Sequence, residues 1–165
     1  MTQTPTALPR ARWLERRIPP LLVGLACAAL MYGLAQVTPG LPIALPPALR
    51  LLLALLVLAA GVAVCLAGAL AFRQARTTVN PIHPERTSAL VIRGIYHRTR
   101  NPMYLGFALM LLGWGLWLAA PFALAGVVLF MLYIERYQIP PEERMLEQLF
   151  GADYLAYREQ VRRWL

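Results

Sequence analysis

The sequence has few charged residues and no lysine. Only 15% of its 165 residues are charged, and all sixteen basic residues are arginine. Hydrophobic residues make up 59% of the chain. The mean hydropathy of +0.54 is too high for a soluble domain of this length. These figures argue against an ordinary soluble domain and predict a single membrane domain over residues 1–165.

Several motifs that carry well-known chemistry are also absent. There is no phosphate-binding P-loop, no Gly-x-Gly-x-x-Gly after a strand, no Gly-x-Ser-x-Gly and no Cys/His metal spacing. Cys27 and Cys65 lie inside apolar runs, where a thiol acts as a small hydrophobic group. His83 and His97 have no carboxylate at ligand spacing, which favours loop positions over metal binding. We therefore predict neither a disulfide nor a metal site.

Long apolar runs are what the sequence does contain. The first run, residues 18–37, is longer than the roughly 7–15 residues of a signal-peptide core. We therefore expect it to be a membrane helix that is kept in the mature protein. The last is uncharged only as far as Ile134, so a helix of about 20 residues must continue through Glu135 and Arg136. We predict membrane spans at about residues 18–37, 51–72, 103–120 and 122–139.

Residues within and between these runs predict how the helices pack. Gly61, Cys65 and Ala69 fall on one face of the second span, where small residues let another helix approach closely. The third run stops at Pro121 and the fourth begins at once, which predicts an antiparallel hairpin. We expect a break at residues 140–141, where two prolines stand, and then a last helix.

The last part of the chain has an amphipathic pattern. Large apolar residues recur at helical spacing among arginines, which is typical of a helix lying on an anionic membrane surface. These residues are Tyr154, Tyr157, Val161 and Trp164. The predicted fold is therefore an all-α integral membrane protein, with about four transmembrane helices and a cytoplasmic interfacial helix at the C-terminus.

The distribution of arginine predicts the orientation. Four arginines precede the first span, six lie in the long loop before the third span, and five lie from Arg136 onward. Only Arg50 falls on the other side, and all eight acidic residues share the arginine-rich side. Arginine concentrates in cytoplasmic loops of membrane proteins, so we place both termini in the cytoplasm. The net charge of +8 is thereby assigned to topology, and we expect no nucleic-acid partner.

Two polar clusters are candidates for a binding site. Residues 88–104 are basic and partly polar, and Asn101 and Pro102 suit the cap and first position of a helix whose start attracts anions. The second cluster includes Glu135, Arg136, Glu142 and Glu143, and we expect the hairpin to bring it beside the first. A snorkelling ion pair and acidic residues that complement a helix dipole would account for the second cluster equally well.

The residue types in these clusters suit a ligand with one anionic end, one cationic end and an aromatic part. The start of the helix and Arg100 would hold a carboxylate, and Glu142 an ammonium or ribose hydroxyls. Tyr96 and Tyr104 offer aromatic faces to a sulfonium. S-Adenosyl-L-methionine has these groups, as do many other zwitterions in part.

The motifs in the second half of the chain resemble those of a known family. Gly94-Ile95-Tyr96, Arg100-Asn101-Pro102-Met103-Tyr104-Leu105-Gly106, Glu142-Glu143 and Phe150-Gly151-x-x-Tyr154-x-x-Tyr157 stand in the same order and spacing. The family is that of isoprenylcysteine carboxyl methyltransferases and phospholipid methyltransferases, which are integral membrane enzymes dependent on S-adenosyl-L-methionine. The resemblance begins at about Thr77, and the first two spans match only in hydropathy.

The resemblance implies roles for individual residues. Arg136 would lie near the methyl acceptor and Glu143 beside the pocket, and we assign these two as the catalytic candidates. The implied cofactor-binding residues are Ser88, Ala89, Leu90, Val91, Tyr96, Arg100, Asn101, Pro102, Met103, Tyr104 and Glu142.

The chain departs from the eukaryotic members at three positions. Ser88 and Asn101 stand where those proteins have histidine, and Gln138 stands where they have a second arginine. The absence of lysine and the abundance of Ala and Leu suggest a GC-rich bacterial genome. We therefore expect a bacterial inner-membrane member that acts on a small or lipid-like acceptor, with the bilayer as its surroundings.

We expect the protein to align the two reactants, and we expect no nucleophilic side chain to take part. The chain would hold the acceptor about 3–3.5 Å from an already activated methyl group. Arg136 would orient a carboxylate or thiolate acceptor, and Glu135 or Glu143 would take the proton from an amine. Two alternatives stay open: a membrane-embedded, nicotinamide-dependent lipid reductase, and a membrane protein without catalytic activity.

Overall fold

The structure is a computed structural model that describes residues 18–38, 45–75 and 89–165. Every regular element in these residues is helical, which confirms the all-α prediction. The elements are α1 (Pro20–Val37), α2 (Pro47–Gln74), η3 (Gly94–His97), α3 (Pro102–Leu118), η4 (Pro121–Leu124), α4 (Ala125–Tyr133), η5 (Ile134–Gln138) and α5 (Ile139–Gln160).

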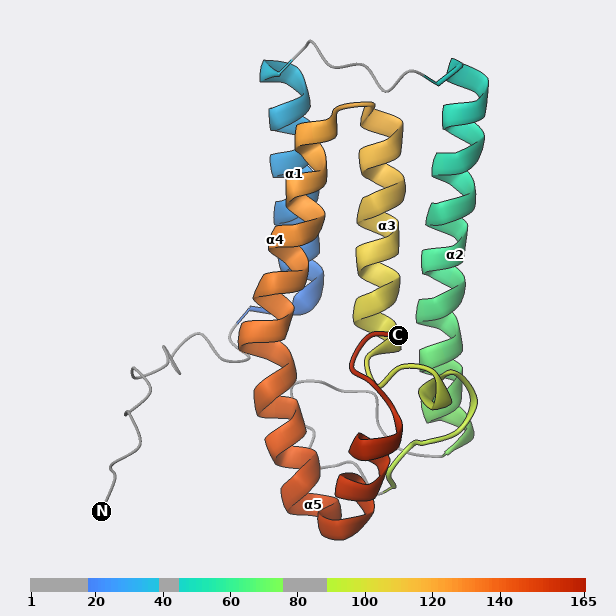
Figure 1. Ribbon diagram of the computed structural model, residues 1–165, viewed down its shortest axis with the longest axis vertical. Coiled ribbons are helices and arrows are strands. Elements are labelled where there is room, and N and C mark those ends of the chain that lie inside the picture. The colour runs from blue at the N-terminus through green and yellow to red at the C-terminus, as the bar shows by residue number, and fades with distance from the viewer. Residues whose placement is uncertain (1–17, 39–44, 76–88) are drawn as a thin grey trace, which may run out of the picture.

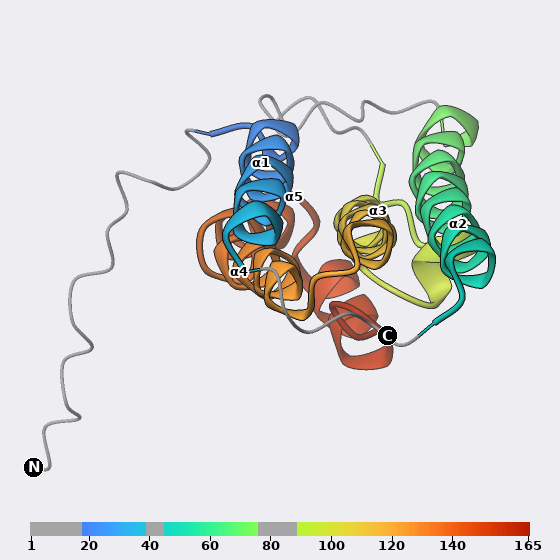
Figure 2. The same ribbon diagram turned by 90° about the horizontal axis from the view of Figure 1, so that it is seen from above.

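The long helices stand side by side, with α3 between α2 and the pair formed by α1 and α4 (Figures 1 and 2). Three helical stretches in the described residues are long and apolar enough to cross a membrane: Pro20–Val37, Pro47–Gln74 and Pro121–Gln160. The helix α3 is equally apolar but has only 17 residues.

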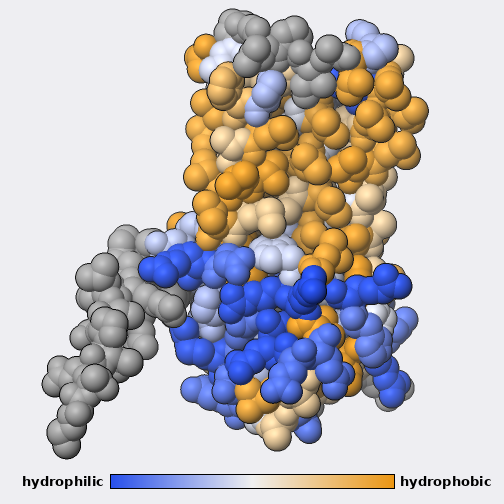
Figure 3. Space-filling model, viewed as in Figure 1, coloured by the Kyte–Doolittle hydropathy of each residue, from blue (hydrophilic) through white to orange (hydrophobic). Residues whose placement is uncertain are grey.

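The outside of this bundle is apolar. Figure 3 shows hydrophobic residues over most of the height of the bundle and hydrophilic residues gathered at its lower end. Many leucines are exposed on α1 and α2, among them Leu21, Leu25, Leu52, Leu55 and Leu66. A soluble protein rarely exposes so large an apolar surface, and lipid is the medium that suits it. The chain is therefore a membrane protein, as predicted.

The helices α2 and α3 pack closely through glycines. A Cβ atom added to Gly106 of α3 would lie only 2.6 Å from the carbonyl oxygen of Gly61 on α2. The Cys65 thiol, one turn further along, donates a hydrogen bond to the carbonyl of Met103 at 3.3 Å. Farther along α2 the contact passes to Gly68, which faces the ring of Pro102. The predicted ridge of small residues is confirmed at Gly61 and Cys65.

The turn between α3 and α4 is tight. Ala119 has a left-handed backbone (φ 56°), and the 3-10 turn η4 begins two residues later at Pro121. The left-handed residue ends α3 and reverses the chain, so α4 runs antiparallel to α3 (Figure 1), as predicted. Met31 of α1 and Phe130 of α4 are fully buried in the core that these helices share.

The helix after α4 differs from the prediction of a break at residues 140–141. The chain stays helical from α4 into α5, and only Ile139 separates the π-helical turn η5 from the two prolines. In this turn the N–H of Ile139 bonds to the carbonyl of Ile134, five residues back. Prolines are tolerated in the first turn of a helix, and the wider π turn shifts the hydrogen-bond register just where their N–H groups are missing.

The prediction that the apolar face of the C-terminal helix lies on the membrane surface was wrong for three of the four residues on which it rested. Tyr154, Tyr157 and Val161 are buried in a cluster with Val91 and Tyr96. The chain turns sharply within α5 at Gly151 (φ 50°, ψ −120°), a backbone conformation that glycine adopts readily. This reversal directs the apolar face into the protein and leads residues 161–165 back to the lower end of α3 (Figure 1).

Candidate active site

The site begins at the segment that precedes α3. The backbone N–H of Arg100 donates to the carbonyl of Arg162 at 2.9 Å. The hydroxyl of Thr99, which is fully buried, donates to the carbonyl of Arg163 at 2.9 Å. The side-chain amide of Asn101 donates to the same carbonyl at 3.1 Å. The segment before α3 is therefore fixed by the end of the chain.

Asn101 does not act as the predicted N-cap. It occupies the N-cap position of α3, but its side chain makes no capping hydrogen bond. The amide is turned toward the carbonyl of Arg163 instead, and the hydroxyl of Thr99 accepts the backbone N–H of Asn101 at 3.2 Å. The side chain of Asn101 bonds to the carbonyl of Arg163 in place of the first turn of α3, and Thr99 donates to the same carbonyl.

The two predicted polar clusters meet at the first turns of α3 and α5. The hydroxyl of Tyr104 on α3 donates a hydrogen bond to Oε1 of Glu142 on α5. Tyr104 is buried, whereas Glu142 is partly exposed. Residues 38 positions apart in the sequence are thus joined at the polar end of the bundle, as the hairpin predicted.

A network of ion pairs lies next to this contact. Glu143 accepts hydrogen bonds from Nε and Nη2 of Arg163 at 2.9 and 2.6 Å, and Arg100 Nη2 lies 3.1 Å from its Oε1. Glu135 accepts from Nη1 of Arg163 at 2.9 Å and from the indole N–H of Trp164 at 2.8 Å. The hydrogen bonds to Glu143 raise the pKa of Arg163 above its usual value, so its guanidinium stays charged.

An aromatic wall borders the site. Tyr96, in η3, packs edge-on against Phe72 with ring centroids 5.4 Å apart. The hydroxyl of Tyr157 donates to the carbonyl of Tyr96 at 2.7 Å. Burial first, and then Tyr157 and the nearby Glu142, raises the pKa of Tyr96, which is therefore neutral at physiological pH.

The remaining predicted site residues divide between this region and others. Val91 is buried in the cluster around Tyr96, and Leu90 packs at the edge of that cluster. Ala89 is half-buried, and Ser88 lies outside the described residues. Pro102 is buried and Met103 half-buried at the start of α3, where both face Gly68 of α2.

Arg136 and Gln138 take no part in the ion pairs among the described residues. Arg136 is exposed on the π turn and forms no hydrogen bond or ion pair with other described residues. Gln138 is buried, and its amide donates to the carbonyl of Ile18 at 2.6 Å, next to α1. Of the residues on the π turn, Glu135 is the one joined to the cluster.

The sequence did not single out three residues that contact the ion pairs or the segment before α3. They are Thr99, Arg163 and Trp164. Arg163 and Trp164 belong to the segment assigned to the membrane surface, and Thr99 has no distinctive neighbours in sequence. The signal available was Gly151, because a glycine within an amphipathic helix permits the reversal that returns the tail to α3.

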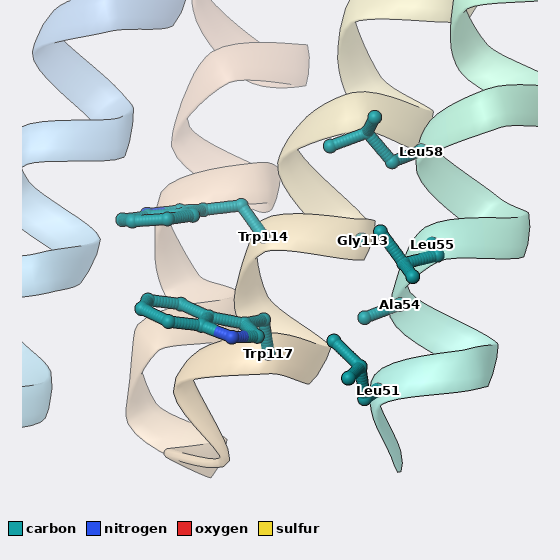
Figure 4. A pocket seen from close by; sticks show the side chains of 7 residues that line it. All are labelled: Leu51, Ala54, Leu55, Leu58, Gly113, Trp114 and Trp117. Carbon is teal, nitrogen blue, oxygen red and sulfur yellow. The ribbon is translucent and has the colours of Figure 1, made fainter. Parts of the chain in front are cut away.

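A separate apolar cavity of about 200 Å³ lies between α2 and α3 (Figure 4). Its lining comes from the first turns of α2 and the last turns of α3, whereas the ion pairs lie before the start of α3. The rings of Trp114 and Trp117 are stacked there, with centroids 5.0 Å apart. The cavity presents no polar surface and is lined by Leu51, Ala54, Leu55, Leu58, Gly113, Trp114 and Trp117. It therefore offers none of the groups on which the predicted chemistry depends.

The fold and the site together define a helical membrane protein with a cluster of ion pairs and tyrosines at one end of its bundle. Residues 49–153 match the family model described as phospholipid methyltransferase. That is well over half of the 165 residues, and the chain belongs to this family. The family resemblance inferred from the motifs is thereby confirmed.

The curated relatives include proteins named as methyltransferases. An uncharacterized protein of Haemophilus influenzae is 49% identical over 63 residues, which are 38% of this chain and all of that protein. Protein-S-isoprenylcysteine O-methyltransferase A of Arabidopsis thaliana is 37% identical over 82 residues, 48% of this chain and 41% of the plant protein. A probable protein-S-isoprenylcysteine O-methyltransferase of Oryza sativa is 33% identical over 85 residues, 52% of this chain and 44% of that protein.

The plant relatives are longer proteins. The alignments with them cover less than half of their length. No solved structure matches the chain.

Proposed function

We propose that the protein transfers a methyl group from S-adenosyl-L-methionine to a small or lipid-like acceptor at the cytoplasmic face of a bacterial inner membrane. The observation that carries this proposal is the hydrogen bond between Tyr104 and Glu142. It joins the two segments that bear the family motifs, at the polar end of an apolar bundle.

The chemistry of the donors and acceptors fits this cofactor. Nε of Arg100 is buried and has no hydrogen-bond partner in the described part of the chain, which leaves a donor for the carboxylate. Glu142 has the charge to hold the ammonium or accept from the ribose hydroxyls. Tyr96 and Tyr104 supply aromatic faces beside a carboxylate, an environment that suits a sulfonium.

The other cofactor contacts are proposed from the same arrangement. The apolar stretch before η3 would form the wall for the adenine, and the start of α3 would hold the polar end of the amino acid. The residues concerned are Ala89, Leu90 and Val91 for the wall, and Asn101, Pro102 and Met103 at the start of α3. Ser88 is proposed from the family resemblance alone, because it lies outside the described residues.

Bound S-adenosyl-L-methionine supplies a methyl group that is already activated for transfer. The work of the chain is then to bind both reactants, hold the acceptor in line and exclude water. Arg136 is exposed on the same π turn that carries Glu135, so we propose that it orients an anionic acceptor. Both oxygens of Glu143 are engaged by guanidinium groups, so we assign to Glu143 the role of orienting Arg100 rather than that of a base.

We propose a separate route of entry for each reactant. An acceptor with an apolar tail would approach sideways from the bilayer, along the apolar outside of the bundle. The water-soluble cofactor would enter from the polar end, which we assign to the cytoplasm because arginine concentrates on that side.

Calorimetry on the detergent-solubilised protein tests the choice of cofactor. We expect S-adenosyl-L-methionine to bind and NADPH not to bind; binding of NADPH alone would support the lipid reductase instead. Glu142→Ala should lose most of the binding while circular dichroism shows an unchanged helix content. Unchanged binding in Glu142→Ala would support a protein without catalytic activity. Incubation with labelled S-adenosyl-L-methionine and host membrane extract would then identify the acceptor from the labelled product.

A further inference from the structure

The segment that follows α5, residues 161–165, makes contacts that the proposed function leaves unused. Its backbone carbonyls at Arg162 and Arg163 accept three hydrogen bonds from the segment directly before α3. One of the donors, the hydroxyl of Thr99, is fully buried. The tail is thus built into the segment that carries Arg100 and Asn101.

The side chain of Arg163 connects the tail to the other half of the site. Its Nε and Nη2 bind both oxygens of Glu143, at 2.9 and 2.6 Å, and its Nη1 binds Glu135 at 2.9 Å. A guanidinium has the fork of donors for such contacts, whereas an ammonium is a point charge. One residue therefore holds two carboxylates and, through its own carbonyl, the start of α3.

The π turn explains how one guanidinium reaches both carboxylates. Glu135 and Glu143 are eight residues apart, and in a regular α-helix this spacing turns two side chains about 80° apart around the axis. The turn η5 holds more residues per turn than an α-helix, so it reduces this angle. Both carboxylates then face the side on which Arg163 lies.

We propose that Arg163 is a positioning residue of the cofactor pocket, which acts through Glu143 and Arg100 and through its carbonyl on Asn101. This inference rests on the proposed function. Oε1 of Glu143 contacts the guanidinium groups of both Arg163 and Arg100. Loss of the Arg163 side chain therefore frees Glu143 to rotate, and it also removes the ion pair of Glu135. Arg100, whose Nε is the donor proposed for the cofactor carboxylate, then loses its fixed orientation.

The test compares Arg163→Gln and Arg163→Lys with matched changes at Arg158. Arg158 also pairs with a glutamate, Glu147, at 3.3 Å, but this pair is on the surface with side chains 42% and 45% exposed. We expect Arg163→Gln to weaken the binding of S-adenosyl-L-methionine by about tenfold or more, and Arg163→Lys by about threefold, because lysine keeps the charge and loses the fork. Arg158→Gln and Arg158→Lys should stay within about twofold of the unchanged protein.

Two further measurements separate positioning from mere support of the fold. With labelled S-adenosyl-L-methionine and membrane extract, a positioning role raises KM for the cofactor and leaves kcat within about threefold, whereas partial unfolding lowers kcat at constant KM. In the ligand-free protein, hydrogen exchange at the backbone N–H of Arg100 should be about tenfold faster in Arg163→Gln than in Arg158→Gln.

The outcomes are distinct. Equal cofactor affinity and equal exchange at Arg100 in Arg163→Gln and Arg158→Gln would overturn the proposal. If Arg163→Gln does not fold, the comparison is made with Arg163→Lys. Equal affinity for S-adenosyl-L-methionine in Arg163→Lys and Arg158→Lys would then overturn the proposal. If the unchanged protein binds no S-adenosyl-L-methionine, the proposed function fails and the positioning role fails with it. Hydrogen exchange at the backbone N–H of Arg100 then still shows whether residues 161–165 order the segment before α3.

Discussion

Replacement of Gly106 by alanine tests the close approach of α2 and α3, on which the position of the candidate site depends. The added Cβ would lie 2.6 Å from the carbonyl oxygen of Gly61 and 3.1 Å from the backbone nitrogen of Cys65, and it would also meet the Cys65 sulfur. Non-bonded carbon contacts are normally about 3.5–4.0 Å. Two of the three atoms belong to the backbone of α2, so a side-chain rotation does not relieve the overlap and the helices must separate by roughly 1 Å.

The size of the effect follows from this geometry. Overpacking of a well-packed core costs about 1–3 kcal/mol, and we expect the upper end because backbone atoms must move. For a chain of this length about 1 kcal/mol corresponds to about 2–4 °C in Tm, so Tm should fall by about 6–12 °C. Thermal unfolding in detergent, followed by circular dichroism, measures this change.

Gly33→Ala is the matched control, because a Cβ added at Gly33 meets nothing within 4 Å. Alanine also favours a helix more than glycine does, so the Tm of this variant should be unchanged or slightly higher. Adding Cys65→Ala to Gly106→Ala should restore only part of the loss, since the carbonyl of Gly61 stays in place. A Gly106→Ala protein as stable as Gly33→Ala would refute the reasoning.

Three other predictions concern the polar end. Tyr104→Phe and Glu142→Ala should each weaken S-adenosyl-L-methionine binding about tenfold or more, and the double variant should lose little further; additive losses in calorimetry would contradict a shared role. Tyr157→Phe removes the donor to the carbonyl of Tyr96 and should lower the free energy of unfolding by about 1 kcal/mol, and an unchanged Tm would show that this hydrogen bond does not contribute. Gly151→Ala forces a side chain into a glycine conformation, so a stability loss of about 1–3 kcal/mol is expected in thermal unfolding, and no loss would mean that the reversal tolerates other residues.

The membrane helices and the meeting of the two polar clusters could be predicted because each depends on a short stretch of sequence. An apolar run is long enough to span or it is not, and Pro121 between two runs leaves room only for a hairpin. The hairpin then returns the first turn of α5 to the first turn of α3, and Tyr104 contacts Glu142. The small residues Gly61 and Cys65 likewise indicated where a second helix would pack.

The π turn and the tail could not be predicted in the same way. A single sequence does not show that the helix continues past two prolines, because the wider turn before them depends on how α4 packs. The amphipathic pattern of residues 154–164 shows that one face is apolar, but it does not show whether lipid or protein covers that face. Tyr154 and Tyr157 are covered by protein, because Gly151 reverses the chain.

The sequence by itself determined the class of fold and the family, because hydropathy and ordered motifs are properties of the chain alone. Only the tertiary structure decided which groups share the polar end. Hydrogen bonds such as those of Arg163 join residues from three separate segments. Their geometry depends on a π turn and on a reversal that Gly151 permits but does not by itself specify.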